Sequence, residues 1–151
     1  MPRVGELAPD LKLLDDQGKS VKLSDFRGKK VVLYFYPADF TSGCELQACS
    51  FRDAYPQFEA KNAVVLGVSP DGVESHKKFR DTLNLPFHLL VDGDFAQAKV
   101  WGCYGTRTND DGTTAPRVLR SHYVIDEKGK IIDVQSPVKP NESVRLALDM
   151  L

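Results

Sequence analysis

Apolar and polar residues occur in blocks along this chain, and the block lengths predict alternating strands and helices. The most apolar block, Val31–Tyr36, reads Val-Val-Leu-Tyr-Phe-Tyr and contains no charged residue. A run of β-branched and aromatic residues of this length is typical of a central strand that is buried on both faces. Ala63–Ser69 has the same character and predicts a second buried strand.

The segment between these two strands has the periodicity of a helix. Its apolar residues recur at spacings of four, three, four and three positions: Cys44, Ala48, Phe51, Tyr55 and Phe58. Ser42 and Glu45 match a capping box, which predicts Ser42 as the helix cap with Glu45 reaching back to it. Pro56 is expected to end or kink the helix near Tyr55.

Shorter apolar segments predict the remaining strands. Leu11–Leu14 and Ser20–Leu23 flank a polar turn and predict a β-hairpin near the N-terminus. Ser121–Ile125 and Lys130–Val134 flank Asp-Glu-Lys-Gly and predict a second hairpin. Phe87–Val91 predicts one further short strand.

Three more helices are expected, over Val73–Leu83, over Phe95–Trp101, and from an Asn141 cap to Leu151. Residues 103–119, rich in glycine and polar residues, read as a loop. The order of elements is that of an α/β protein. It predicts a thioredoxin-like fold, with a mixed central sheet, flanking helices and an added N-terminal β-hairpin.

Size and charge narrow the classes of function. A chain of 151 residues with 42% apolar residues predicts a single domain over residues 1–151. The net charge of −1, without a basic block, argues against nucleic acid or anionic membranes as partners. No apolar run approaches the roughly 18 residues of a membrane span, and the N-terminus lacks a secretory signal pattern.

The cysteine content indicates the compartment. Three cysteines are an odd number and too few for a disulfide scaffold. A cytoplasmic location with at least partly reduced thiols is therefore expected.

The segment from Pro37 to Leu46 carries the candidate chemistry. Cys44 is expected in the first turn of its helix, where unpaired backbone N–H groups favour an anion and lower the pKa of a thiol. Thr41 is close enough in sequence to bond either the sulfur or a bound substrate. Pro37 lacks an N–H group and cannot compete for acceptors in the pocket. The alternative is that Cys44 is a buried structural cysteine, because it also begins the apolar stripe.

A second cysteine, Cys49, follows Cys44 by five positions. On an α-helix this spacing gives a rise of about 7.5 Å and a rotation of about 140°, so the Cα atoms lie about 8.6 Å apart. Disulfides need Cα separations below about 7 Å. Pairing of Cys44 with Cys49 therefore requires the first one or two turns to unwind. The alternative is that Cys49 is an unrelated thiol.

Metal and cofactor chemistry is not favoured. One C-x4-C pair without a nearby histidine is a poor zinc site. His76, His88 and His122 are isolated in sequence and are expected on strand or helix surfaces rather than as ligands. Nucleotide-binding glycine motifs and a C-x-x-C pair are absent from the sequence. A Cys–His hydrolase stays open, although no partner histidine stands out.

The run Tyr34-Phe-Tyr-Pro37-x3-Thr41-x2-Cys44 resembles the peroxiredoxin active-site signature. The spacing from Cys44 to Cys49 resembles that of the peroxiredoxin Q, or bacterioferritin comigratory protein, subgroup. The resemblance continues through Arg120–Asp126 and covers nearly the whole chain.

The resemblance implies reduction of hydrogen peroxide or alkyl hydroperoxides. It implies that Cys44 is the peroxidatic residue and becomes a sulfenic acid, and that Cys49 resolves it as an intramolecular disulfide. Thioredoxin or a similar dithiol would reduce that disulfide. Arg120 matches the active-site arginine, at the start of a strand expected beside Val31–Tyr36, with Arg117 as its rival. No metal, haem or flavin is implied.

Several positions depart from the subgroup pattern. Ser42 replaces a common proline, Glu45 a common threonine and Gln47 a common glutamate. The charge of Glu45 would oppose a thiolate at Cys44. Cys103 has no counterpart and is either a packed core thiol or an alternative resolving thiol.

Two other functions remain open for the same cysteine pair. A thiol–disulfide oxidoreductase would exchange the pair with protein thiols, and a redox-sensing binding module would change a surface on oxidation. Nothing in the chain marks a dimer surface, so a monomer is expected.

Overall fold

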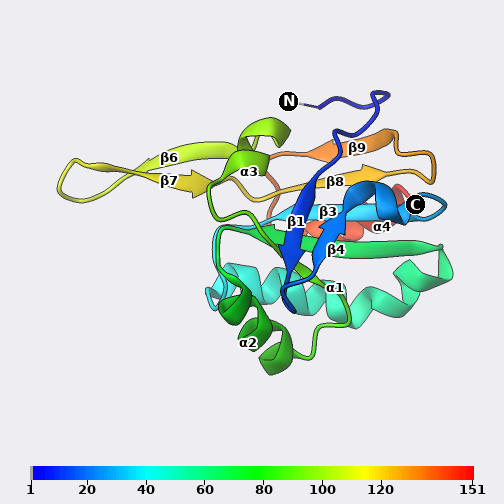
Figure 1. The fold of residues 1–151 in the computed structure, drawn as a ribbon, viewed down its shortest axis with the longest axis horizontal. Coiled ribbons are helices and arrows are strands. Elements are labelled where there is room, and N and C mark those ends of the chain that lie inside the picture. Colours follow the sequence, from blue (N-terminus) through cyan, green and yellow to red (C-terminus); the bar gives the residue numbers. More distant parts are fainter. Residues whose placement is uncertain (1) are drawn as a thin grey trace.

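The computed structural model describes residues 2–151, which contain a seven-stranded mixed sheet. Helices lie on both faces of this sheet (Figure 1). The strands lie in the order β2-β1-β5-β4-β3-β8-β9. Their bounds are β1 Lys12–Asp15, β2 Ser20–Lys22, β3 Lys30–Phe35, β4 Ala63–Ser69, β5 Leu89–Val91, β8 Ser121–Ile125 and β9 Ile131–Gln135. The mixed α/β architecture predicted from the sequence is confirmed.

The two most apolar segments form the middle of the sheet. β3 pairs in parallel with β4 on one side and antiparallel with β8 on the other. Both predicted hairpins are present, β1–β2 and β8–β9. The first joins the sheet because β1 also pairs with β5. This order places the ends of β3 and β4 beside the start of β8.

Helices α1 (Ser42–Ala60), α2 (Val73–Leu83) and α4 (Ser143–Asp149) pack on one face of the sheet (Figure 1). The short α3 (Ala96–Trp101) packs on the other face. Successive residues of β3 point to opposite faces, so Tyr34 joins the α1 side while Leu33 and Phe35 join the α3 side. The sheet thus divides two hydrophobic cores.

The boundaries predicted for α1 need two corrections. The helix cap is Thr41 rather than Ser42, so Cys44 occupies the position that a capping-box glutamate would need. The helix does not end at Tyr55 but continues through Pro56 to Ala60. Phe58 is fully buried on the same apolar stripe as Phe51. The free energy gained from burying Phe58 offsets the loss of the backbone hydrogen bond that Pro56 cannot donate.

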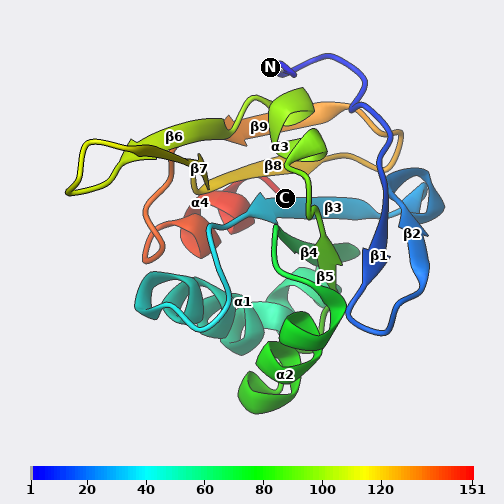
Figure 2. The same ribbon diagram turned by 60° about the vertical axis from the view of Figure 1, so that its left-hand side comes forward.

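The segment predicted as a loop over residues 103–119 is instead mostly a hairpin. β6 (Tyr104–Thr108) pairs antiparallel with β7 (Thr114–Val118), and Figure 2 shows this hairpin extending away from the main sheet. Its residues are mostly exposed, so the apolar alternation that marks a half-buried strand is weak.

The last helix is shorter than predicted. It spans Ser143–Asp149 with Glu142 as its cap, rather than running from Asn141 to Leu151. The backbone N–H groups of Glu142 and Ser143 both donate to the carbonyl of Lys139, which forms a turn before the helix begins. Within residues 2–151, none of the helices is both long enough and apolar enough to cross a membrane.

Candidate active site

The loop Pro37–Thr41 connects the end of β3 to the start of α1 and sets the position of Cys44. With Thr41 as cap, Cys44 is the third residue of the helix rather than about the second. It remains in the first turn, where backbone N–H groups lack partners within the helix and attract negative charge. The side chain is 1% exposed, so a thiolate here is largely shielded from water.

Arg120 is the cation that hydrogen-bonds this sulfur. It immediately precedes β8, and the register Phe35↔Ser121 brings it beside the end of β3. Its Nη2 donates to Sγ of Cys44 at 3.2 Å. The rival Arg117 lies exposed on β7. The predicted strand pairing is confirmed, and a guanidinium does lie against the sulfur.

Thr41 and Pro37 shape the loop. The hydroxyl of Thr41 donates to the backbone carbonyl of Ala38 at 2.9 Å, which tightens the turn rather than bonding the sulfur. Its oxygen lone pairs remain available as acceptors. Pro37 and Thr41 border a cleft of about 260 Å³ that is also lined by Phe95, Pro116 and two arginines. Such a cleft has room for the organic part of a substrate.

Gln47 is a site residue that the sequence identified only as a departure from the subgroup pattern. Its Oε1 accepts a hydrogen bond from Nη1 of Arg120 at 2.7 Å, and its Nε2 donates to Oγ of Ser143 at 3.1 Å. Gln47 is fully buried. Its place three residues after Cys44, on the same face of the helix, is the signal that could have found it.

Cys49 lies half-buried about one and a half turns further along α1. The helix is continuous across Cys44 and Cys49, and both cysteines are free thiols. The separation of about 8.6 Å expected for helical Cα atoms five residues apart therefore applies. Joining the two sulfurs requires this part of α1 to unwind.

Cys103 belongs to the other face of the sheet. It packs fully buried in the core that contains Trp101 and Tyr123, whereas Cys44 packs in the core beneath α1. Burial raises the pKa of the Cys103 thiol to about 12, so it stays protonated near neutral pH. These features favour the core-thiol interpretation over an alternative resolving role.

The expectation that all three histidines lie on surfaces is wrong for His76 and His122, which are fully buried. Nδ1 of His76 lies 2.7 Å from the carboxylate of Asp39, and its Nε2 donates to the carbonyl of Leu90. Tyr36 also donates to Asp39, at 2.6 Å. The partners of His76 come from segments distant in the sequence, so hydrophobic periodicity does not reveal that it is buried.

Asp39 lies in the middle of the active-site loop, so these contacts anchor that loop to α2. Its backbone N–H also donates to Asp71, at the end of β4. No pattern in the sequence indicates this anchor.

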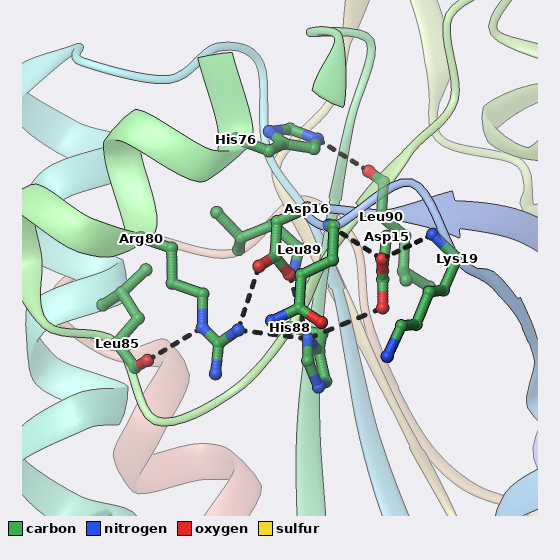
Figure 3. A network of polar contacts seen from close by, with 10 residues as sticks. Asp15, Asp16, Lys19, His76, Arg80, Leu85, His88, Leu89 and Leu90 are labelled. Atoms are coloured by element: carbon green, nitrogen blue, oxygen red, sulfur yellow. Dashed lines mark hydrogen bonds and ion pairs between the residues drawn. The ribbon is translucent and has the colours of Figure 1, made fainter. Parts of the chain in front are cut away.

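Within residues 2–151, two groups of side chains bring three possible metal ligands within 4.8 Å of one another: Asp39, Asp71 and His76, and Asp15, Asp16 and His88. In the second group Arg80 donates to Asp16 at 2.9 Å (Figure 3). Burial works to raise the pKa of Asp16, but hydrogen bonds from Arg80 and His88 outweigh it and lower that pKa. Since Arg80 supplies the positive charge, this group is a structural ion pair.

Three comparisons with known proteins give a consistent result. The AhpC/TSA family model matches residues 4–134. Peroxiredoxin Bcp of Bacillus subtilis (strain 168) is 44% identical over 148 residues, which cover 98% of this chain and 94% of the relative.

Solved structures agree with the sequence relatives. Peroxidoxin BcpB from Mycobacterium tuberculosis superposes with a TM-score of 0.88 at 32% identity, covering 99% of this chain and 96% of that one. A Xanthomonas campestris bacterioferritin comigratory protein, described for its alkyl peroxide reduction activity, gives a TM-score of 0.85 at 29% identity, covering 92% and 88%.

Proposed function

The chain belongs to the AhpC/TSA family, in its peroxiredoxin Q and Bcp branch, and on that premise we propose that Cys44 is the thiol that attacks the peroxide. The protein is a thiol-dependent peroxidase. The observation that carries the residue assignment is the contact of 3.2 Å between Nη2 of Arg120 and Sγ of Cys44 at a helix N-terminus.

In the first step the Cys44 thiolate attacks one peroxide oxygen and the O–O bond breaks. Cys44 becomes a sulfenic acid, and the other oxygen takes up a proton and leaves as water or an alcohol. Arg120 and the N–H groups of the first turn stabilise the charge that develops on sulfur and oxygen. The hydroxyl oxygen of Thr41 accepts a hydrogen bond from the substrate. Pro37 has no N–H group that could compete for the hydrogen-bond acceptors in the pocket.

In the second step the thiol of Cys49 attacks the sulfenic sulfur of Cys44. A disulfide forms and water leaves, so the oxidation state set by the peroxide is retained in the S–S bond. The start of α1 unwinds to bring the two sulfurs together, because the intact helix holds them too far apart.

We assign the reduction of this disulfide to thioredoxin or a similar dithiol. The substrates are hydrogen peroxide and organic hydroperoxides, the latter supported by the cleft beside Pro37 and Thr41. Residues 1–151 act as one domain and as a monomer, because every group in both steps comes from this chain. The free thiols suit the reducing conditions of the cytoplasm.

The test is a peroxide-consumption assay with thioredoxin, thioredoxin reductase and NADPH. Wild-type protein is expected to consume hydrogen peroxide and tert-butyl hydroperoxide, whereas Cys44→Ser is expected to consume neither. Cys103→Ser is the matched control and should turn over like the wild type. Reduction of protein disulfides without loss of peroxide would instead favour a thiol–disulfide oxidoreductase.

A further inference from the structure

A series of hydrogen bonds, called the relay below, runs from Arg120 through Gln47 and Ser143 to His122. Arg120 donates to Gln47 at 2.7 Å, Gln47 donates to Ser143 at 3.1 Å, and Oγ of Ser143 lies 2.7 Å from Nδ1 of His122. Gln47, Ser143 and His122 are each 0% exposed. These three side chains therefore join α1, α4 and β8 out of contact with water, behind the partly exposed Arg120.

The direction of the two hydrogen bonds made by Gln47 follows from the groups involved. A guanidinium has only donors, so the oxygen of the Gln47 amide must face Arg120 and its nitrogen must donate to Ser143. The hydroxyl hydrogen of Ser143 is then free to be donated to His122. Burial lowers the pKa of His122 to about 4, more than the nearby Asp133 raises it, so the ring is neutral near pH 7 and Nδ1 can accept.

We propose that Ser143 and His122 are positioning residues for the peroxidase reaction: they hold the Gln47 amide toward Arg120 and restrain the segment of α1 that must unwind. This inference rests on the roles proposed above for Cys44 and Cys49. Ser143 and His122 act through Gln47 and do not themselves contact the sulfur.

The relay supports the first chemical step. Arg120 sets which way the Gln47 amide faces, and Ser143, by accepting from the amide nitrogen, holds the amide in place. Without that acceptor the buried NH₂ group loses its partner, and the side chain can move away from the guanidinium. Arg120 would lose a charge-assisted hydrogen bond and shift relative to Cys44. Attack on peroxide is therefore expected to slow.

The same relay opposes the second step. Gln47 lies between Cys44 and Cys49, and its bonds to Arg120 and Ser143 must break when this segment unwinds. While α1 stays folded, the sulfenic acid is open to a second peroxide, which would oxidise it to a sulfinic acid and leave as water or alcohol. Weakening the relay is therefore expected to favour the disulfide over the sulfinic acid.

These opposite effects define the experiment. The first quantity is the rate constant for oxidation of Cys44 by hydrogen peroxide in a Cys49→Ser background, read by quenched-flow mass spectrometry. The second is the hydrogen peroxide concentration that converts half of the Cys49-containing enzyme to sulfinic acid during turnover with dithiothreitol. Ser143→Ala is expected to lower the first and raise the second, each by about three- to tenfold, the effect of one lost hydrogen bond.

Two comparisons separate positioning from general damage. Ser143→Thr keeps the hydroxyl and is expected to restore both values. In a Gln47→Ala background, Ser143→Ala should change neither value, because the residue through which it acts is gone. Ser143→Gly serves in the same comparisons if Ser143→Ala does not fold.

The inference is overturned if Ser143→Ala leaves both quantities unchanged, moves them in the same sense, or keeps its effect without Gln47. Failure of the proposed function looks different. In that case the Cys49→Ser protein with an intact relay would itself form no sulfenic acid at Cys44.

Discussion

Arg120 makes two different hydrogen bonds from one side chain. Nη2 donates to the Cys44 sulfur at 3.2 Å and Nη1 donates to Gln47 at 2.7 Å. A planar guanidinium can make both bonds in a fixed geometry, whereas an ammonium group is a single point on a flexible chain. The identity of this residue as arginine, and not only its charge, is therefore expected to matter.

Arg120→Lys is expected to lower the rate constant for Cys44 oxidation by roughly ten- to a hundredfold. This range corresponds to the loss of one hydrogen bond to a charged group, about 1.5 to 3 kcal/mol. Single-turnover oxidation with hydrogen peroxide measures it. Arg145→Lys is the matched control, since Arg145 is exposed on α4, away from the cleft. Equal losses in the two variants would contradict the assignment of Arg120.

Cys103→Ala tests whether the third thiol takes part. Cys103 is fully buried and lies across the sheet from Cys44, so turnover with thioredoxin is expected to stay within about twofold of the wild type. Disulfide mapping of the oxidised wild-type protein should find Cys103 as a free thiol. A Cys44–Cys103 disulfide in that map would reassign the resolving role.

Single residues were predicted from the sequence where local spacing determines their place. The place of Cys44 near a helix N-terminus follows from neighbouring residues in the chain, whereas Arg120 was identified through the resemblance to peroxiredoxins. Gln47, Ser143 and His122 come together only through tertiary packing, with 96 positions between Gln47 and Ser143. Their contacts could not be inferred from one sequence.

At the level of elements, the proposed reaction requires α1 to adopt two incompatible arrangements. The folded helix places Cys44 against Arg120, and the disulfide needs the segment between Cys44 and Cys49 to open. The stripe from Ala48 to Phe58 is packed in the core and keeps the rest of the helix in place. Unwinding is therefore expected to be confined to the first turns.

Oxidation to the Cys44–Cys49 disulfide is expected to remove one to two helical turns, about four to seven of the 19 residues of α1. Circular dichroism at 222 nm before and after one equivalent of peroxide measures this loss. Cys49→Ser treated in the same way should keep its signal. A mapped Cys44–Cys49 disulfide with an unchanged spectrum would contradict this prediction.

The elements predicted well are those with strong periodicity. β4 and α2 have the predicted bounds, and β3 differs by one residue at each end. The errors are the β6–β7 hairpin, both ends of α1 and both ends of α4. The hairpin is mostly exposed, and at the helix ends caps, turns and tertiary packing decide the boundary.

For the whole molecule, His122 links stability to pH. Its pKa is lowered to about 4 because the ring is buried, so the unfolded chain binds a proton more readily than the folded protein. The stability that depends on neutral His122 is complete above the unfolded pKa of about 6.5 and is lost as the pH falls toward 4. Acid therefore favours unfolding through this residue.

The free energy of unfolding is expected to fall by about 2 to 3 kcal/mol through His122 alone between pH 7 and pH 4.5. Urea unfolding at both pH values measures the total change for wild type and for His122→Asn. The difference between the two proteins in this pH-dependent change of the free energy of unfolding gives the contribution of His122. An equal pH dependence in both would show that His122 does not couple stability to pH.

The fold of the whole chain could be predicted because segments with clear strand and helix patterns alternate along the sequence. Few architectures accommodate that order of elements. The division into two cores on opposite faces of the sheet was not predicted. It is this division that separates Cys103 from Cys44.

The central claim is that Cys44 attacks peroxide and Cys49 completes the reaction. Mass spectrometry after one equivalent of hydrogen peroxide tests it most directly, on wild-type protein and on Cys49→Ser. The account predicts a Cys44–Cys49 disulfide in the first and a sulfenic acid on Cys44 in the second. Consumption of the peroxide with Cys44 still a free thiol in both proteins would contradict it.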